Sequence, residues 1–405
     1  MGKSSSVRDQ VASAAVRTVN RLSRMTGKGS GTVVGGRVGI KIAPDLVSSL
    51  ARGRTVILVS GTNGKTTTTS MTVAGWGGPV TTNETGANMP AGHVAALAES
   101  KEDHVALEVD EAWLAHTLAS TRPSVVVLLN LSRDQLDRAN EVRHLAERWR
   151  KALEAYQDDD LVVVANANDP LVVYAGEVRA NTVWCDVPTS WLADALSCPK
   201  CTLAISHVGS AWHCSCGFAK PLQVTTTLGD ELVVDGTSVT LDLSMPGEFN
   251  RSNAAMALTA LHSVNVNLEV AVRRVNAIQS VVGRFSVRRW RGHVLRLLLA
   301  KNPSGFAAMM ATLPDDGSDV WVAINARVAD GHDPSWLYDV PFEMLRGHRV
   351  YCFGDRRLDL ATRLDYAEVD FVVVDNDELV PTSKETISLL ANYTAFSDWL
   401  ARSEP

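Results

Sequence analysis

The sequence predicts an α/β protein whose strands form parallel sheets covered by helices on both faces. Three observations predict this fold class. Short runs rich in β-branched residues alternate with longer segments of helical length. The composition, 45% hydrophobic and 21% charged over 405 residues, is typical of a globular chain with two or three domain cores. No run approaches eighteen consecutive apolar residues, so we expect no transmembrane helix.

The first 30 residues predict one amphipathic helix that ends near Gly27. Its apolar stripe consists of Val7, Val11, Ala14, Thr18, Leu22 and Met25. We expect the helix to dock on the protein through this stripe, which is the usual role of such a helix. The segment carries six basic side chains and one acid, so weak attraction to an anionic membrane surface is the alternative. Residues 1–36 are therefore interpreted as a helix followed by a Gly-rich lead-in.

Residues 37–283 predict the first α/β domain. Its strands are expected at Thr55–Ser60, Val105–Val109, Val125–Leu129 and Leu161–Ala165. Val224–Leu243 alternates like an antiparallel hairpin, and helical patterns follow at Ser252–Val264 and Leu268–Ser280.

Residues 284–405 predict a second α/β domain, with the boundary near Gly283. Its strands are expected near Val294–Leu299, Val320–Ile324, Arg349–Phe353 and Phe371–Val374. The same alternation of strand and helix makes this domain Rossmann-like.

A phosphate-binding loop is predicted where the first strand gives way to a helix. The segment reads Gly61-Thr62-Asn63-Gly64-Lys65-Thr66. Backbone amides at such a turn point toward an anion, and glycines allow its close approach. We expect Lys65, as an exposed loop cation, to reach the phosphates of ATP, and the Thr66 hydroxyl to bind Mg²⁺. The alternative is a Gly-rich turn, which would not need Lys65.

Carboxylates are predicted beside this loop. Glu108 and Asp110 end a buried strand, and the next strand continues into Asn130–Arg138. Ligands of parallel sheets bind at the carboxyl ends of the strands, and Mg²⁺ prefers oxygen ligands. Glu108 is therefore our predicted magnesium ligand together with Thr66.

Four cysteines predict a structural zinc ribbon inserted at about residues 195–220. They are Cys198, Cys201, Cys214 and Cys216. Zn²⁺ takes four thiolates in a tetrahedron, and clustered cysteines favour metal and a reducing compartment over disulfides. His213 could replace one thiolate. Cys185 and Cys352 lie in apolar contexts and are interpreted as core thiols.

Gly61–Thr66, Glu108 and Asn130–Arg138 together resemble the central domain of the Mur ligase family, which also includes folylpolyglutamate synthase. Members join an amine to a carboxylate through an acyl phosphate made with ATP. Met245–Ala255 resembles the family segment that contacts the adenine side of ATP, and Gly283-Arg284 resembles the family hinge. The resemblance implies that Asn250, Asn253 and Arg284 bind the base and ribose side of ATP.

Within that family the chain resembles the MurT branch, the ligase subunits of lipid II isoglutaminyl synthase. The stretch before Gly61 is short for a UDP-binding domain, and the four-cysteine insertion is typical of the branch. Asn325–Asp339 resembles its D-G-x-D-x-S-W-x-x-D stretch, and Asn392–Ala395 resembles its N-Y-T-A ending.

This resemblance implies a function in peptidoglycan biosynthesis. The expected reaction is ATP-dependent amidation of the α-carboxylate of D-glutamate in the lipid II stem peptide, giving D-isoglutamine. Ammonia would come from a GatD-like glutaminase in a heterodimer, and an Asp of this chain would complete the partner's triad. Asp333 is our candidate, ahead of Asp330 and Asp339; the alternative for Asp333 is a turn residue before Pro334. The expected location is the cytoplasm, at the inner face of the membrane, with at most peripheral membrane contact.

Two other functions compete with this interpretation. A folylpolyglutamate-synthase-like ligase would act alone on a soluble carboxylate, and would leave the cysteine cluster and the Asp330–Asp339 stretch unexplained. A zinc-ribbon NTPase would bind nucleic acid and would need a basic face. The 39 basic and 45 acidic side chains give a net charge of −6, so we expect no nucleic-acid partner.

Overall fold

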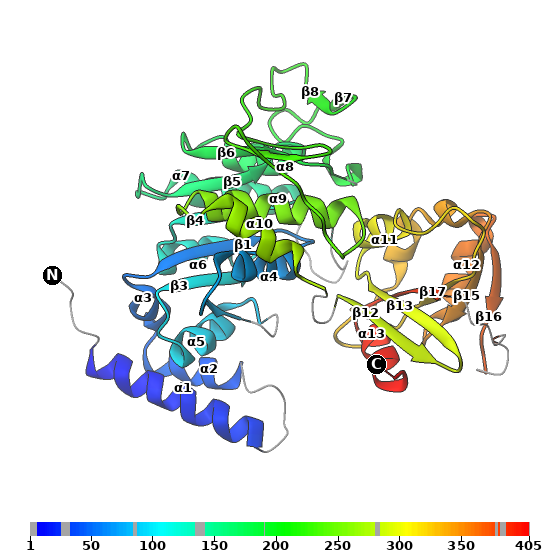
Figure 1. The fold of residues 1–405 in the computed structure, drawn as a ribbon, viewed down its shortest axis with the longest axis horizontal. Coiled ribbons are helices and arrows are strands. Elements are labelled where there is room, and N and C mark those ends of the chain that lie inside the picture. Colours follow the sequence, from blue (N-terminus) through cyan, green and yellow to red (C-terminus); the bar gives the residue numbers. More distant parts are fainter. Residues whose placement is uncertain are drawn as a thin grey trace.

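The computed structural model describes residues 6–25, 33–83, 87–133, 142–189, 191–279, 284–376, 380 and 386–404. Two large sheets, one in each half of the chain, organise these residues (Figure 1). A third, two-stranded sheet consists of β7 (Ser206–Val208) and β8 (Ala211–His213). No helix among them is both long enough and apolar enough to cross a membrane.

The first sheet has the strand order β11-β10-β9-β6-β5-β4-β1-β3-β2 within the described residues. Its strands are β1 (Thr55–Ser60), β2 (Thr81–Thr82), β3 (His104–Val109), β4 (Val125–Leu128), β5 (Val162–Asn166), β6 (Thr182–Asp186), β9 (Thr226–Leu228), β10 (Leu232–Val234) and β11 (Thr237–Val239). Strands β1 to β6 pair in parallel, whereas β10 pairs antiparallel with β9 and β11. The predicted parallel strands and the antiparallel hairpin are therefore confirmed.

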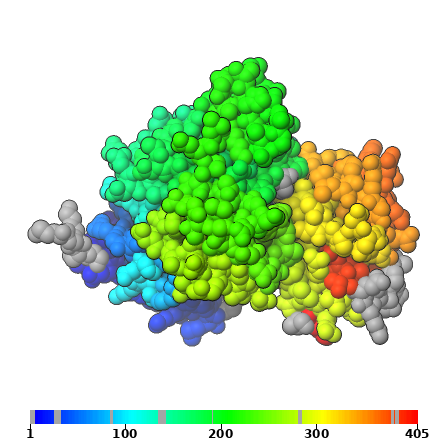
Figure 2. All heavy atoms as spheres, turned by 45° about the horizontal axis from the view of Figure 1, so that its top comes forward, coloured from blue at the N-terminus to red at the C-terminus, as the bar shows by residue number. Residues whose placement is uncertain are grey.

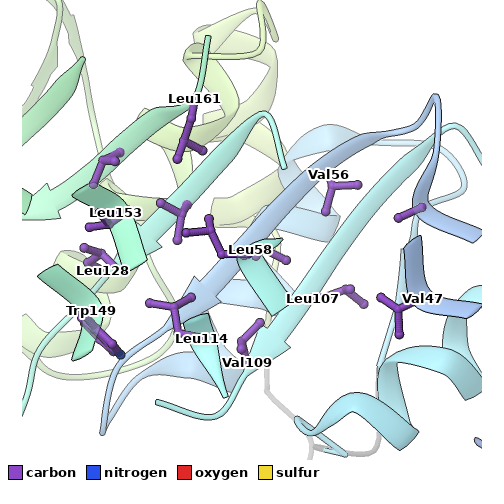
Figure 3. Packing of buried hydrophobic residues seen from close by; sticks show 14 of the residues in the cluster. Val47, Val56, Leu58, Leu107, Val109, Leu114, Leu128, Trp149, Leu153 and Leu161 are labelled. Carbon is purple, nitrogen blue, oxygen red and sulfur yellow. The ribbon is translucent and has the colours of Figure 1, made fainter. Parts of the chain in front are cut away.

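Helices cover both faces of this sheet because its central strands are apolar on both sides. Along β1, Val56 and Leu58 face one cluster of buried side chains while Ile57 and Val59 face the other. Figure 3 shows the first cluster, in which the strand residues pack against Trp149. Its helices are α3 (Leu46–Ala51), α5 (Pro90–Glu99), α6 (Leu114–Thr121), α7 (Val142–Glu154) and α8 (Pro170–Gly176). The second cluster is covered by α4 (Lys65–Trp76), α9 (Glu248–His262) and α10 (Leu268–Asn276).

The second sheet has the order β12-β13-β17-β14-β15-β16 within the described residues. Its elements are β12 (Phe285–Trp290), β13 (His293–Leu299), α11 (Pro303–Met310), β14 (Val320–Ala323), β15 (Arg349–Phe353), α12 (Arg357–Tyr366), β16 (Asp370–Val373), β17 (Thr386–Ala391) and α13 (Tyr393–Arg402). The four predicted strands are present, and the structure adds β12 and β17. The predicted boundary residue Gly283 lies outside the described residues, so the division into domains stays a prediction.

The predicted N-terminal helix is present as α1 (Val7–Met25), but the predicted docking stripe is wrong. The buried side chains of α1 are Ala12, Ser13, Val16 and Asn20, on the opposite face. The cause lies in α2 (Val34–Ile42), which begins inside the predicted Gly-rich lead-in. A Cβ atom on Gly35 would lie 2.1 Å from Asn20 Oδ1, so the two helices approach closely through their small residues.

Gly36 should be indispensable for this packing. A Cβ atom there would lie 1.7 Å from the Ala91 carbonyl oxygen at the start of α5. We expect Gly36→Ala to lower the free energy of unfolding by roughly 1–3 kcal/mol, because the clash with backbone outweighs the gain in helix propensity of about 1 kcal/mol. Urea denaturation measures the change. Gly229→Ala is the matched control, since its Cβ would meet nothing within 4 Å. Equal stabilities for both variants would contradict this packing.

Candidate active site

The loop between β1 and α4 has the geometry of a phosphate-binding loop. Gly64 has φ +87°, and a Cβ atom there would lie 2.4 Å from Asn253 Oδ1 on α9. Glycine is therefore required at this position. The backbone amides at the start of α4 belong to a helix N-terminus, where the helix dipole favours an anion.

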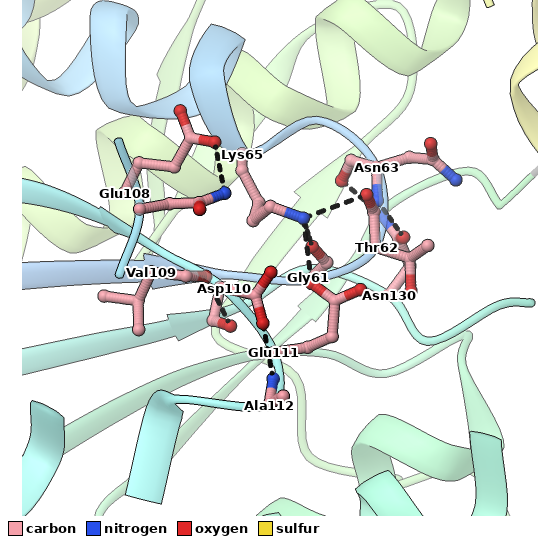
Figure 4. A network of polar contacts seen from close by, with 12 residues as sticks. Gly61, Thr62, Asn63, Lys65, Glu108, Val109, Asp110, Glu111, Ala112 and Asn130 are labelled. Carbon is pink, nitrogen blue, oxygen red and sulfur yellow. Dashed lines mark hydrogen bonds and ion pairs between the residues drawn. The ribbon is translucent and has the colours of Figure 1, made fainter. Parts of the chain in front are cut away.

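Lys65 is buried, and our expectation of an exposed cation is wrong. Its side chain is 6% exposed and folds back over the loop (Figure 4). The ammonium donates to the carbonyl oxygens of Gly61 and Thr62 and forms an ion pair with Glu111 Oε2 at 2.9 Å. Glu111 is itself 8% exposed and lies just beyond the end of β3. Sequence reasoning stopped at Asp110 and missed this carboxylate.

Thr66 and Glu108 lie together, as predicted. The Thr66 hydroxyl donates to Glu108 Oε2 at 2.7 Å, and Arg284 Nη2 donates to the same hydroxyl oxygen at 2.7 Å. A hydroxyl and a buried carboxylate at the phosphate loop fit the oxygen preference of Mg²⁺. We predicted Arg284 on the base and ribose side of ATP, whereas its guanidinium lies at the phosphate end of the site.

The phosphate loop also contacts the second half of the chain. Asn63 Nδ2 donates to Ser304 Oγ at 2.8 Å, and Asn302 Nδ2 donates to Asn63 Oδ1 at 3.2 Å. Asn302 is the N-cap of α11, with its side chain accepting a bond from Gly305 N. Ser304 was missed, because its contact with the loop spans 241 positions of sequence.

A cavity of about 730 Å³ collects most of the predicted ATP residues. Those that line it are Thr62, Asn63, Gly64, Lys65, Thr66, Glu108, Asn250, Asn253 and Arg284. Gly61 precedes Thr62 in the same loop and is not among the lining residues. Residues of the second half of the chain, including Lys301 and Tyr393, complete the wall. Figure 2 shows the two halves of the molecule in contact, green beside yellow and orange.

Asp169 is a further carboxylate of this cavity that sequence reasoning did not identify. It caps the N-terminus of α8 through bonds from Leu171 N and Val172 N, and also accepts a bond from Leu131 N at 2.8 Å. Burial raises the pKa of Asp169 to about 6. Through these three bonds Asp169 links the start of α8 to Leu131, and so holds in place the segment that follows β4 beside the phosphate loop.

The four clustered cysteines can hold one metal ion. Their sulfur atoms all lie within 4.8 Å of one another, with 3.7 Å between Cys198 and Cys216 and 3.4 Å between Cys201 and Cys214. A tetrahedron with metal–sulfur bonds of about 2.3 Å places sulfurs about 3.8 Å apart, so the set fits. His213 is exposed and lies outside this set.

The other two cysteines are core thiols. Cys185 and Cys352 are both fully buried, and burial raises the pKa of each to about 12. A thiol with so high a pKa carries almost no thiolate at neutral pH, so neither residue is a nucleophile.

The three acids of the Asn325–Asp339 stretch differ in their surroundings. Asp330 is buried and accepts a bond from Thr394 N at 2.8 Å, and Asp339 pairs with Arg133 at 3.1 Å. Asp333 is exposed, and its Oδ1 accepts a bond from Ser335 N at 2.8 Å. That bond lowers the pKa of Asp333, so it is ionised at neutral pH. None of the three lines the cavity at the phosphate loop.

Comparisons with known proteins agree with this geometry. The family profile of the Mur ligase middle domain matches residues 59–261, and that of the MurT ligase C-terminal domain matches residues 299–396. Subunit MurT of lipid II isoglutaminyl synthase (glutamine-hydrolyzing) from Staphylococcus aureus (strain COL) is 27% identical, over 95% of each chain. The protein of the same name from Streptococcus pneumoniae (strain ATCC BAA-255 / R6) is 26% identical, over 93% of each.

A solved structure shows the same fold. The MurF ligase from Thermotoga maritima, in complex with ADP, superposes with a TM-score of 0.61 at 14% identity, over 90% of this chain and 83% of that one. The profile of the middle domain alone spans half of the sequence. The chain therefore belongs to the Mur ligase family, with a C-terminal region of the MurT type.

Proposed function

We propose that the chain is the ATP-dependent ligase subunit of a lipid II isoglutaminyl synthase in peptidoglycan biosynthesis. It amidates the α-carboxylate of D-glutamate in the lipid II stem peptide, giving D-isoglutamine, at the inner face of the cytoplasmic membrane. The observation that carries this proposal is the single cavity in which the phosphate loop, a buried carboxylate and residues of the MurT-type region meet. The relatives named MurT, aligned over almost their whole length, support it.

The first step is the transfer of the γ-phosphoryl group of ATP to a carboxylate oxygen of the substrate. A bond forms between that oxygen and phosphorus, and the bond from phosphorus to the departing ADP oxygen breaks. Lys65 and Arg284 bring positive charge to the phosphate loop, where it stabilises the charge of the transferring group. Thr66 and Glu108 would hold Mg²⁺, which would neutralise phosphate charge when bound.

The second step is the attack of ammonia on the carbonyl carbon of the acyl phosphate, with release of phosphate. Ammonia is mostly protonated in water at neutral pH, and the ammonium ion is no nucleophile. A GatD-like glutaminase that releases ammonia from glutamine beside this site removes that cost. Asp333 is the acid that we assign to its triad, because it is ionised and exposed, while Asp330 is buried and Asp339 pairs with Arg133.

Zinc in the four-cysteine site is structural in this proposal. All four positions of a tetrahedral ion are taken by thiolates, so no position is left for a substrate. The site closes a small module around the hairpin of β7 (Ser206–Val208) and β8 (Ala211–His213). Trp212 Nε1 donates to the Ala167 carbonyl oxygen at 3.0 Å and ties this module to the first sheet.

Lys65 should be required for ATP-dependent amidation. Lys65→Met alone removes the cation that faces the buried Glu111, so we expect it also to cost roughly 3–5 kcal/mol of stability. The double variant Lys65→Met/Glu111→Gln removes both charges and should recover most of this stability without recovering activity. Urea denaturation and amidation of lipid II in the presence of the glutaminase measure the two effects. Near-normal amidation by the double variant would remove the phosphate-loop assignment.

Purified protein should carry about one zinc ion per chain. Cys201→Ser should lower the zinc content and the melting temperature together, because the free energy of metal binding contributes to folding. Elemental analysis and thermal melting measure both quantities. Cys352→Ser is the matched control, since it also changes a cysteine but should keep the zinc. The assignment fails if the wild-type chain carries no metal and chelators leave its melting unchanged.

Asp333→Asn should separate glutamine hydrolysis from the ligase reaction. The amide keeps the size of the side chain and its bond to Ser335, but loses the charge that stabilises an imidazolium. We expect glutamine-dependent amidation to fall by roughly 10²-fold or more, with partner and ATP binding retained. High external ammonia should restore part of the rate.

Asp339→Asn is the control for this experiment and should keep glutamine-dependent activity. A turn residue at Asp333 would give a modest loss of stability and equal losses with glutamine and with ammonia. That equal loss would contradict the assignment of Asp333 to the triad.

A further inference from the structure

The solvent-facing side of α1 is apolar, which is the reverse of a normal surface helix. The exposed fractions of Val7, Val11, Leu22 and Met25 are 76%, 54%, 56% and 83%. At 100° per residue these positions fall within about 60° of one another around the helix. Ala12 and Val16, on the opposite side, are buried against α2 and α5. Figure 1 shows α1 at the outer edge of the molecule, and the exposed fractions place the stripe on the solvent side of the helix.

Arginines border this stripe on both sides. Arg8 lies along one flank, and Arg17, Arg21 and Arg24 lie along the other, all of them exposed. Arg24 forms an ion pair with Glu99 at 3.0 Å, and Arg8 and Arg17 each donate one bond to a backbone carbonyl oxygen. The single acid of the helix, Asp9, points inward and accepts a bond from Ser49 Oγ at 3.0 Å. The helix is therefore locally basic on a chain whose net charge is −6.

Exposed cations continue on the neighbouring helix. Arg37 and Lys41 of α2 are exposed, and so is the apolar Val34 one turn before Arg37. These two cations lie on the helix that packs against α1, so they add positive charge close to that of α1.

We propose that α1 is a docking surface for an anionic lipid bilayer, with its apolar stripe among the headgroups and its arginines on lipid phosphates. Charge complementarity favours a bilayer, because the arginines on both flanks of the apolar stripe can bind the negatively charged phosphates of lipid headgroups. A protein partner would favour aromatic anchors, and α1 contains no aromatic residue. Only α1 and α2 take part in this docking surface, so it does not depend on the proposed amidation.

Co-sedimentation of the full chain with vesicles tests this proposal. The probes are vesicles of pure phosphatidylcholine and vesicles containing phosphatidylglycerol, with no lipid II in either. We expect binding to the anionic vesicles, weakened by high salt, and much weaker binding to the neutral ones. Val11→Glu/Met25→Glu should lower the partition coefficient at least tenfold, since it places two charges in the stripe. Melting curves confirm that this variant stays folded.

Leu222→Glu/Leu358→Glu is the matched control, because it makes the same change of charge at two exposed leucines away from α1. It should bind vesicles like the wild type. Arg21→Gln should weaken binding to anionic vesicles about fivefold, the effect of one arginine near such a surface.

Equal binding of the stripe variant and the wild type would overturn the proposal, and so would equal binding of the wild type to neutral and anionic vesicles. A third outcome would also overturn it: the wild-type chain forms dimers in sedimentation without binding vesicles, and Val11→Glu/Met25→Glu forms none. The stripe would then be a contact between two copies of the chain.

Discussion

The hydrogen bonds of Asn63 hold the phosphate loop between the two halves of the chain. Its backbone exchanges bonds of 2.9 Å with the Asn130 side chain at the end of β4, and its own amide reaches Asn302 and Ser304 at the start of α11. The loop is thus fixed on one side by the first sheet and faces the second half on the other. A phosphate bound there would contact side chains from both halves of the chain. Such a site can hold ATP and a second substrate next to each other, which the transfer of a phosphoryl group between them requires.

Charge inside this cavity is balanced before any ligand arrives. The Lys65 ammonium faces Glu111, and the Thr66 hydroxyl lies between the Glu108 carboxylate and the Arg284 guanidinium. Such groups interact strongly because burial lowers the local dielectric constant. Because the network is held in place by the strand ends, these dipoles need little reorganisation when a phosphoryl group transfers.

The sequence predicted those features whose residues lie close together along the chain. The phosphate loop, the strand end at Glu108 and the cysteine cluster each depend on residues close together in sequence. The features that were missed depend on distant contacts. The burial of Lys65 requires a carboxylate beyond β3, and the docking face of α1 is set by glycines in α2. The strand β17 pairs between β13 and β14, an order that no local pattern specifies.

We infer that this chain activates a carboxylate of lipid II for ammonia released from glutamine. The most direct measurement follows amide-¹⁵N from labelled glutamine into lipid II, with the chain, a GatD-like glutaminase and ATP. We predict that one ¹⁵N enters each product molecule at the α-carboxyl position of D-glutamate, with one ATP converted to ADP and phosphate. ATP hydrolysis without incorporation of label, or incorporation that needs no ATP, would contradict the account.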